Sequence, residues 1–135
     1  MPIKVLGLMH AGLRVPTDEK SLADAKTVYC DVLGLEVDPK RGHINGIPGF
    51  WANVQPGGQQ LHIMGSDGQS PAARSEKHDP TRPHVALAVD DIEAAQAELA
   101  ARGIECWVYE SLVGKGSKQV FFDDGCGNMI ELQQG

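Results

Sequence analysis

One short pattern occurs twice in this chain, and this duplication limits the possible folds more than any other feature. The stretch "MHAGLRV" at residues 9–15 aligns with "PHVALAV" at residues 83–89, so that His10 falls on His84. Each histidine opens a run of small and β-branched residues that suits a buried strand. The two copies lie about 74 residues apart, which is the separation of the two histidines. A short repeated β-unit cannot bury its own sheet face alone, so the two copies are expected to pack together.

The same kind of helix is predicted after each of these strands. Thr17 or Asp18 is a suitable N-cap for the first helix, and Gly34 is a suitable stop. Apolar residues recur between them at helical spacing: Leu22, Ala25, Tyr29, Val32 and Leu33. The second helix lies within "DDIEAAQAELAARG", where Ile92, Ala95 and Leu99 share one face and Gly103 follows as the stop. The alternation of strand and helix is therefore the same in both halves.

Short strands follow each helix, and a polar segment separates the halves. Residues 3–15 form the first strand, and "LEVD", "GFWANV" and "QQLHIM" follow; the second half repeats this with 84–90, "IECWVYE", "KQVFFD" and "NMIELQ". Residues 65–83 are rich in Gly, Ser and Pro and read as a linker. We expect one α+β domain over residues 1–135, made of two βαβββ modules at about 1–64 and 84–135.

The composition excludes several classes of protein. The chain has 135 residues, 41% of them hydrophobic, which is ordinary for a globular domain. It has no apolar run long enough for a membrane helix and no secretory signal, and its three cysteines suit a reducing cytoplasm. A formal net charge of −6 without a Lys/Arg cluster argues against nucleic-acid binding. We therefore expect a cytoplasmic protein with a small-molecule partner and no membrane partner.

The last strand of each half carries one more residue that can bind a metal. His62 lies between Leu61 and Ile63, and Glu131 lies in the equivalent strand of the second half. A single strand histidine is more often a hydrogen-bonded structural residue than a ligand. Four donors at equivalent places in a duplicated sheet favour one shared site instead. Three imidazoles and one carboxylate suit a divalent Zn, Fe, Mn, Co or Ni ion.

The sequence resembles the vicinal oxygen chelate superfamily, which includes glyoxalase I, bleomycin resistance proteins, methylmalonyl-CoA epimerase and extradiol dioxygenases. The matching stretches, spread over nearly the whole chain, are "HAGLRVPTDEKSLADAKTVYCDVLGLEV", "GFWANVQPGGQQLHIM", "PHVALAVDDIEAAQAEL" and "FFDDGCGNMIEL". The resemblance implies paired βαβββ modules that form an open, cup-like mixed-sheet barrel around one metal. It also implies a homodimer.

The resemblance assigns roles to individual residues. The metal positions of the family fall on His10, His84 and Glu131, with His62 at a fourth and more variable place. Glyoxalase I and the epimerase use Glu or Gln at that place, so His62 departs from both. Arg14 matches the position of an arginine that binds glutathione in glyoxalases of the family. A solvated strand-edge residue is the alternative interpretation of Arg14.

Two further features offer candidate substrate contacts. Lys115 lies in "VGKGSK", a segment without phosphate-loop spacing, and could meet an anionic substrate near the mouth of the cup. Trp107 and Tyr109 alternate on one strand. They are predicted to be core aromatics, with cavity lining as the alternative.

These observations predict a divalent-metal enzyme of the glyoxalase type, that is, a lyase or isomerase with enediolate chemistry. The metal would polarise a carbonyl group of a small oxygenated substrate, and Glu131 would be the general base. Two other functions stay open. One is an extradiol-type dioxygenase that uses Fe(II), and the other is a bleomycin-resistance-type protein that binds a small molecule without catalysis.

Overall fold

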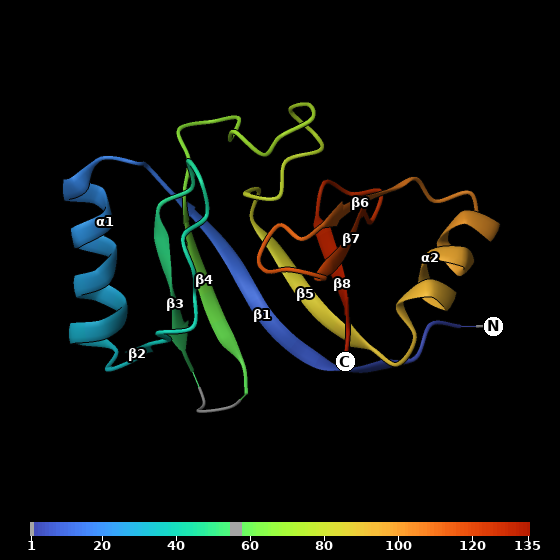
Figure 1. Ribbon diagram of the computed structural model, residues 1–135, viewed down its shortest axis with the longest axis horizontal. Helices are drawn as coiled ribbons and strands as arrows, with labels where there is room; N and C mark the ends of the chain where they lie inside the picture. The colour runs from blue at the N-terminus through green and yellow to red at the C-terminus, as the bar shows by residue number, and fades with distance from the viewer. Residues whose placement is uncertain (1, 55–57) are drawn as a thin grey trace. The chain divides into compact units, whose positions relative to one another are not determined.

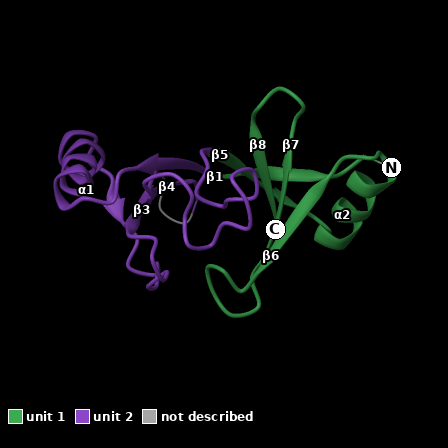
Figure 2. Ribbon diagram, turned by 90° about the horizontal axis from the view of Figure 1, so that it is seen from above, with its two compact units in different colours: residues 1–9, 84–135 green, residues 10–83 purple. Residues whose placement is uncertain are grey.

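The computed structural model describes residues 2–54 and 58–135, which fall into two compact units. Unit 1 comprises residues 1–9 and 84–135, and unit 2 comprises residues 10–83 (Figure 2). Strand β1 (Val5–Val15) contributes to both units, because it passes from unit 1 into unit 2 between Met9 and His10.

Unit 2 contains one helical segment and the first strands of the sheet. After β1 come α1 (Glu19–Lys26), a π-helical turn η1 (Thr27–Val32), β2 (Glu36–Val37), β3 (Gly49–Asn53) and β4 (Gln60–Gly65). Strand β4 pairs with β1 in parallel, while β3 pairs with both β4 and β2 in the antiparallel sense. In Figure 1, α1 runs alongside β3.

Unit 1 repeats this order. Its elements are β5 (His84–Val89), α2 (Ile92–Ala101), β6 (Cys106–Glu110), β7 (Lys118–Asp123) and β8 (Met129–Gln134). Strand β8 pairs with β5 in parallel, and β7 pairs with β8 and β6 in the antiparallel sense. The strand order is β2-β3-β4-β1-β5-β8-β7-β6, an open mixed sheet. The predicted α+β class with two βαβββ repeats is confirmed.

The strand register shows which positions of the two units are equivalent. On β4, His62 pairs with the residue two positions after His10 on β1. On β8, Glu131 pairs with the residue two positions after His84 on β5. The register therefore confirms that His62 and Glu131 occupy matching places relative to the histidine of their own unit.

One face of the strands in each unit packs against that unit's helix. In unit 1, α2 contributes three buried residues to a core with buried strand residues: Ile92, Ala95, Leu99, Val89, Val120 and Leu132. In unit 2, Ala25 of α1 packs with Phe50, Ala52 and Ile63. Side chains alternate along a strand, so the residues between these core positions point to the other face. That other face carries the histidines and Glu131.

The first helix departs from the sequence prediction in its second half. Asp18 is the N-cap as expected, because its side chain accepts a hydrogen bond from Ser21 N. The chain then widens into a π-helical turn, in which Leu33 N donates to Val28 O, five residues back, at 3.0 Å. The prediction that Val32 and Leu33 belong to the apolar face is wrong, since they are 72% and 57% exposed. The wider turn rotates them away from the core.

The described helices include none that is both long and apolar enough to cross a membrane.

Candidate metal site

The histidine and the carboxylate of unit 1 form a buried pair. His84 begins β5 and Glu131 lies in β8, and their side chains are 2% and 5% exposed. Nε2 of His84 lies 3.0 Å from Oε1 of Glu131. This separation fits a hydrogen bond. It also fits two ligands of one metal, because atoms bound at right angles about 2.1 Å from an ion lie about 3 Å apart.

The second carboxylate oxygen of this pair is held by a neighbouring glutamine. Gln133, two residues after Glu131 and therefore on the same face of β8, donates from Nε2 to Glu131 Oε2. The two oxygens of Glu131 thus have different environments, one facing an imidazole and the other an amide donor. The hydrogen bond from Gln133 holds Oε2, while Oε1 faces the imidazole of His84.

The two histidines of unit 2 stack on each other. The rings of His10 and His62 have centroids 3.6 Å apart and planes inclined by 16°. Trp51 of β3 stacks on His62 as well, at 4.4 Å and 9°. His10 is 4% exposed. Stacking against His10 and Trp51 fixes the plane of the His62 ring. A ligand can therefore reach a ring nitrogen of His62 only in that plane.

A hydrogen-bond network assigns the proton on His62. The Nε2 of Gln60 donates to Asp38 at 2.7 Å and to Asn53 at 2.8 Å, which places its Oε1 toward His62. Nε2 of His62 lies 2.9 Å from that oxygen. An amide oxygen can only accept, so His62 Nε2 carries hydrogen and Nδ1 is the nitrogen with a lone pair in the neutral ring. Any metal bound by His62 would therefore be bound through Nδ1.

The predicted donor set has the right chemistry for a metal. His10 of unit 2 and His84 and Glu131 of unit 1 are all buried. Two imidazoles and one carboxylate are suitable ligands for Zn²⁺ and Fe²⁺ alike. A buried carboxylate costs free energy unless it is paired or bound to a cation. The residues present therefore fit a divalent metal of the kind that the sequence predicted.

The two predicted substrate contacts lie in different surroundings. Arg14 donates to the hydroxyl of Thr81 at 2.9 Å and to its carbonyl at 3.2 Å, and pairs with Asp79 at 3.3 Å. Its guanidinium therefore ties β1 to the segment before β5, and a substrate role for it stays a prediction. Lys115 is exposed in the connection between β6 and β7, and its substrate role also stays a prediction.

Asp79 is the central residue of the contacts between Arg14 and the segment that connects β4 to β5. Its carboxylate is fully buried and accepts hydrogen bonds from the backbone and hydroxyl groups of Ser70 and Thr81. Burial alone would raise the pKa of Asp79, but these hydrogen bonds outweigh it and lower the pKa below its ordinary value of 3.8. The segment that the sequence assigns to a linker is thus anchored by a buried charge.

Several of these polar residues were not found from the sequence. Gln60 and Gln133 lie two positions from His62 and Glu131, and this spacing on a strand is the signal that would have indicated them. Asp79 lies in a polar segment with many similar residues, and nothing local distinguishes it.

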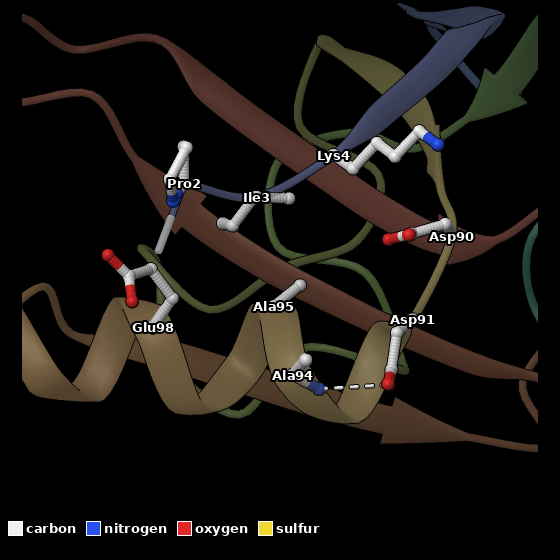
Figure 3. Close-up of a pocket in the computed structure, with 8 residues that line it drawn as sticks. All are labelled: Pro2, Ile3, Lys4, Asp90, Asp91, Ala94, Ala95 and Glu98. Carbon is white, nitrogen blue, oxygen red and sulfur yellow. Dashed lines mark hydrogen bonds between the residues drawn. The ribbon is translucent and has the colours of Figure 1, made fainter.

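A surface pocket lies elsewhere in unit 1, beside the start of α2 (Figure 3). It is lined by Pro2, Ile3, Lys4, Asp90, Asp91, Ala94, Ala95 and Glu98. Asp91 caps α2 there by accepting from Ala94 N, as the dashed line in Figure 3 shows. Ile3 packs against the core on the α2 side of the strands, so this pocket is on the opposite face from His84 and Glu131.

Comparison with known proteins shows the family. Residues 7–132 match the model of the glyoxalase/bleomycin resistance protein/dioxygenase superfamily. Mitochondrial methylmalonyl-CoA epimerase from Mus musculus is 31% identical over 141 aligned positions, covering 98% of this chain and 76% of the mouse protein. The same enzyme from Bos taurus is 33% identical, with 98% and 77% covered. The crystal structure of methylmalonyl-CoA epimerase from Mycobacterium tuberculosis superposes with a TM-score of 0.73 at 25% identity, covering 99% of this chain and 91% of that one.

The chain therefore belongs to the glyoxalase/bleomycin resistance protein/dioxygenase superfamily, as its motifs predicted.

Proposed function

We propose that this protein is a divalent-metal-dependent isomerase that moves a proton at the carbon next to a thioester carbonyl. The proposed substrate is methylmalonyl-CoA or a closely related 2-carboxyacyl thioester. The observation that carries the proposal is the buried His84–Glu131 pair, whose carboxylate has one oxygen held by Gln133 and the other directed at the imidazole. The similarity to methylmalonyl-CoA epimerases over 98% of the chain supports the choice of substrate.

In this proposal, the metal is held by His10, His84 and Glu131, with Nδ1 of His62 as the fourth donor. The support is chemical, because the first three side chains are buried and offer nitrogen and oxygen donors of the kind that divalent metals prefer. The bound metal would supply Lewis-acid stabilisation of the negative charge that develops on the substrate carbonyl oxygen. Which metal ion binds depends on the availability of each metal as much as on the type of these ligands.

Glu131 is the proposed general base. Its Oε1, which would have to leave the metal first, takes the proton from the carbon between the thioester carbonyl and the carboxylate, and the electrons of the broken C–H bond move onto the carbonyl oxygen. Glu131 gives this proton to water, and return of a proton from water to the opposite face of that carbon inverts its configuration. Gln133 keeps Oε2 occupied, so the proton is directed to one oxygen.

Removal of a proton from the carbon next to a carbonyl group is also the first step of glyoxalase-type chemistry. The proposed isomerase therefore keeps the mechanism that the sequence predicted and specifies one reaction within that class. Two curated relatives carry the epimerase name, which favours the thioester substrate. The dioxygenase and the non-catalytic binding protein remain as outcomes that the following experiment can detect.

The test combines metal analysis with an isotope-exchange assay. The purified protein is analysed for its metal content, reconstituted with Zn, Ni, Co, Mn or Fe(II), and incubated with methylmalonyl-CoA in D₂O. We expect the NMR signal of the α-hydrogen to disappear with the wild-type protein. Glu131→Gln should lower the exchange rate by about a hundredfold or more, which is the usual contribution of a general base.

The variant Gln69→Leu, in an exposed loop, is the matched control and should exchange at the wild-type rate. A protein that contains no metal and tolerates Glu131→Gln would support the binding-protein function. Consumption of O₂ by the Fe(II) form with a catechol would support the dioxygenase instead.

A further inference from the structure

Gln119 in β7 carries a buried amide that has no hydrogen-bond partner in the described part of the chain. The residue is 1% exposed, and neither its Nε2 nor its Oε1 has a partner among the described residues. Burying an amide in this way costs free energy, because its hydrogen bonds to water are lost and not replaced. A strand residue of this kind therefore needs an explanation other than packing.

The strand register shows where this amide points. Val120, the next residue, packs into the core against α2. Gln119 and Phe121 must then point to the opposite face, because side chains alternate along a strand. On that face, Phe121 pairs directly with Glu131 of β8. Gln119 is therefore one row away from Glu131, about 7–8 Å between backbones, on the side of the strands that carries the proposed base.

Aromatic side chains surround this position. Tyr109 of β6 is the direct cross-strand neighbour of Gln119 and meets Phe121 edge to face at 5.9 Å. Trp107 stacks with Phe121 at 6.4 Å, and His84 meets the same ring edge to face at 5.7 Å. Hydrogen bonds formed in such a low-dielectric environment are stronger than in water. An amide at this place is well positioned to form a hydrogen bond with a polar group of a small ligand.

We propose that Gln119 is a substrate-recognition residue, whose Nε2 donates a hydrogen bond to an oxygen of the acyl group while Glu131 faces the α-carbon. This inference rests on the proposed function, which it deepens. The acyl group offers two kinds of oxygen, those of the free carboxylate and that of the thioester carbonyl. Both accept a hydrogen bond from a neutral amide, and the row spacing allows one small acyl group to contact both residues.

A substitution of Gln119 separates recognition from a structural role. Gln119→Leu keeps the size of the side chain and removes the unpaired amide, so the melting temperature should stay the same or rise. The dissociation constant for methylmalonyl-CoA, measured by calorimetry, should increase about ten- to hundredfold, the usual effect of losing a hydrogen bond to a charged or buried group. A lower melting temperature with unchanged affinity would overturn the proposal.

Two ligands distinguish the two kinds of oxygen. Propionyl-CoA has the thioester carbonyl and lacks the free carboxylate. If Gln119→Leu weakens binding of methylmalonyl-CoA alone, the amide of Gln119 donates its hydrogen bond to the carboxylate. If the substitution weakens binding of both ligands equally, the amide donates to the thioester carbonyl. Gln119→Glu should weaken methylmalonyl-CoA more than Gln119→Leu does in the first case, because it places two anionic groups together.

The failure of this inference can be told apart from failure of the proposed function. A wild-type protein that binds methylmalonyl-CoA without exchanging its α-hydrogen contradicts the isomerase and leaves the binding measurements on Gln119 valid. Equal affinity of wild type and Gln119→Leu overturns the role of Gln119, whatever the exchange rate. A wild-type protein that binds neither thioester contradicts both. The control is again Gln69→Leu, which should match the wild type in affinity and melting temperature.

Discussion

At the scale of single residues, the candidate site is organised by glutamines as much as by its metal-binding side chains. Gln60 contacts His62 and Gln133 contacts Glu131, each at a distance of two residues along its strand. Because side chains on a strand repeat with a period of two, both pairs share one face. Each glutamine holds the atom of its neighbour that does not face the proposed metal. Orientation of this kind is commonly needed for tight metal binding.

The substitution Gln133→Leu tests this role. Loss of the amide would free Oε2 of Glu131 to rotate, and we expect the affinity for the reconstituting metal to fall about ten- to hundredfold. Competition with a chromophoric chelator measures this affinity directly. The exposed Gln69→Leu variant should bind metal like the wild type. Unchanged affinity in Gln133→Leu would show that the carboxylate is oriented by other groups.

At the scale of elements, the connection between β4 and β5 is anchored to β1 by one ion pair. Arg14 reaches 65 residues along the chain to Asp79, whose carboxylate also accepts from Ser70 and Thr81. Such a charge is stable in a buried place only because its hydrogen bonds and its cation replace the lost water. The connection has no helix or strand, and this cluster gives it a defined course.

The substitution Asp79→Asn should destabilise the protein by about 2–3 kcal/mol at pH 7, since it leaves Arg14 and several donors without their charged acceptor. The folded-state pKa of Asp79 is lowered from 3.8, so its contribution to stability is present above pH 3.8 and is lost as the pH falls further. Urea unfolding from pH 7 to pH 3 should therefore show the two proteins converging below about pH 4.

The substitution Asp67→Asn is the control for Asp79→Asn, because Asp67 lies in the same connection between β4 and β5 but is exposed. Its partner is the nearby Thr17, and Asp67→Asn should change the free energy of unfolding much less than Asp79→Asn does, because solvent screens an exposed charge. An equal effect of both substitutions, or a constant difference at acid pH, would contradict the anchoring role of Asp79.

At the scale of the whole molecule, three large apolar residues are exposed in the first half of β1. Val5, Leu6 and Leu8 are 50%, 53% and 47% exposed, on a strand where neighbouring side chains point both ways. Adjacent exposed apolar residues commonly mark a surface that binds another protein. The homodimer that the sequence resemblance implies stays a prediction, and we expect the first half of β1 to lie at its interface.

Sedimentation velocity tests the dimer. The wild-type protein should sediment as a dimer at micromolar concentration, and Leu8→Glu should shift it toward monomer, because a charge at the interface must be desolvated. Val113→Glu, which alters an exposed apolar residue in the β6–β7 connection, should leave the dimer intact. A monomeric wild type would show that the prediction is wrong.

The sequence by itself determined the features that depend on neighbouring residues. The duplication predicted two βαβββ repeats, and the spacing of Ile92, Ala95 and Leu99 predicted the buried face of α2. The duplication predicted that His62 and Glu131 occupy equivalent places in the two halves, and the register agrees. Periodicity is a local property, because it follows from the geometry of one helix or one strand.

Only the tertiary structure decided which side chains have partners. The burial of Asp79 depends on Arg14, 65 residues away, and the unpaired amide of Gln119 depends on the strands that cover it. The exposure of Val32 depends on a π-helical turn that helical spacing does not reveal. Such features follow from the pairing of distant segments, and the free energy of each polar group is set by the atoms that those segments place around it.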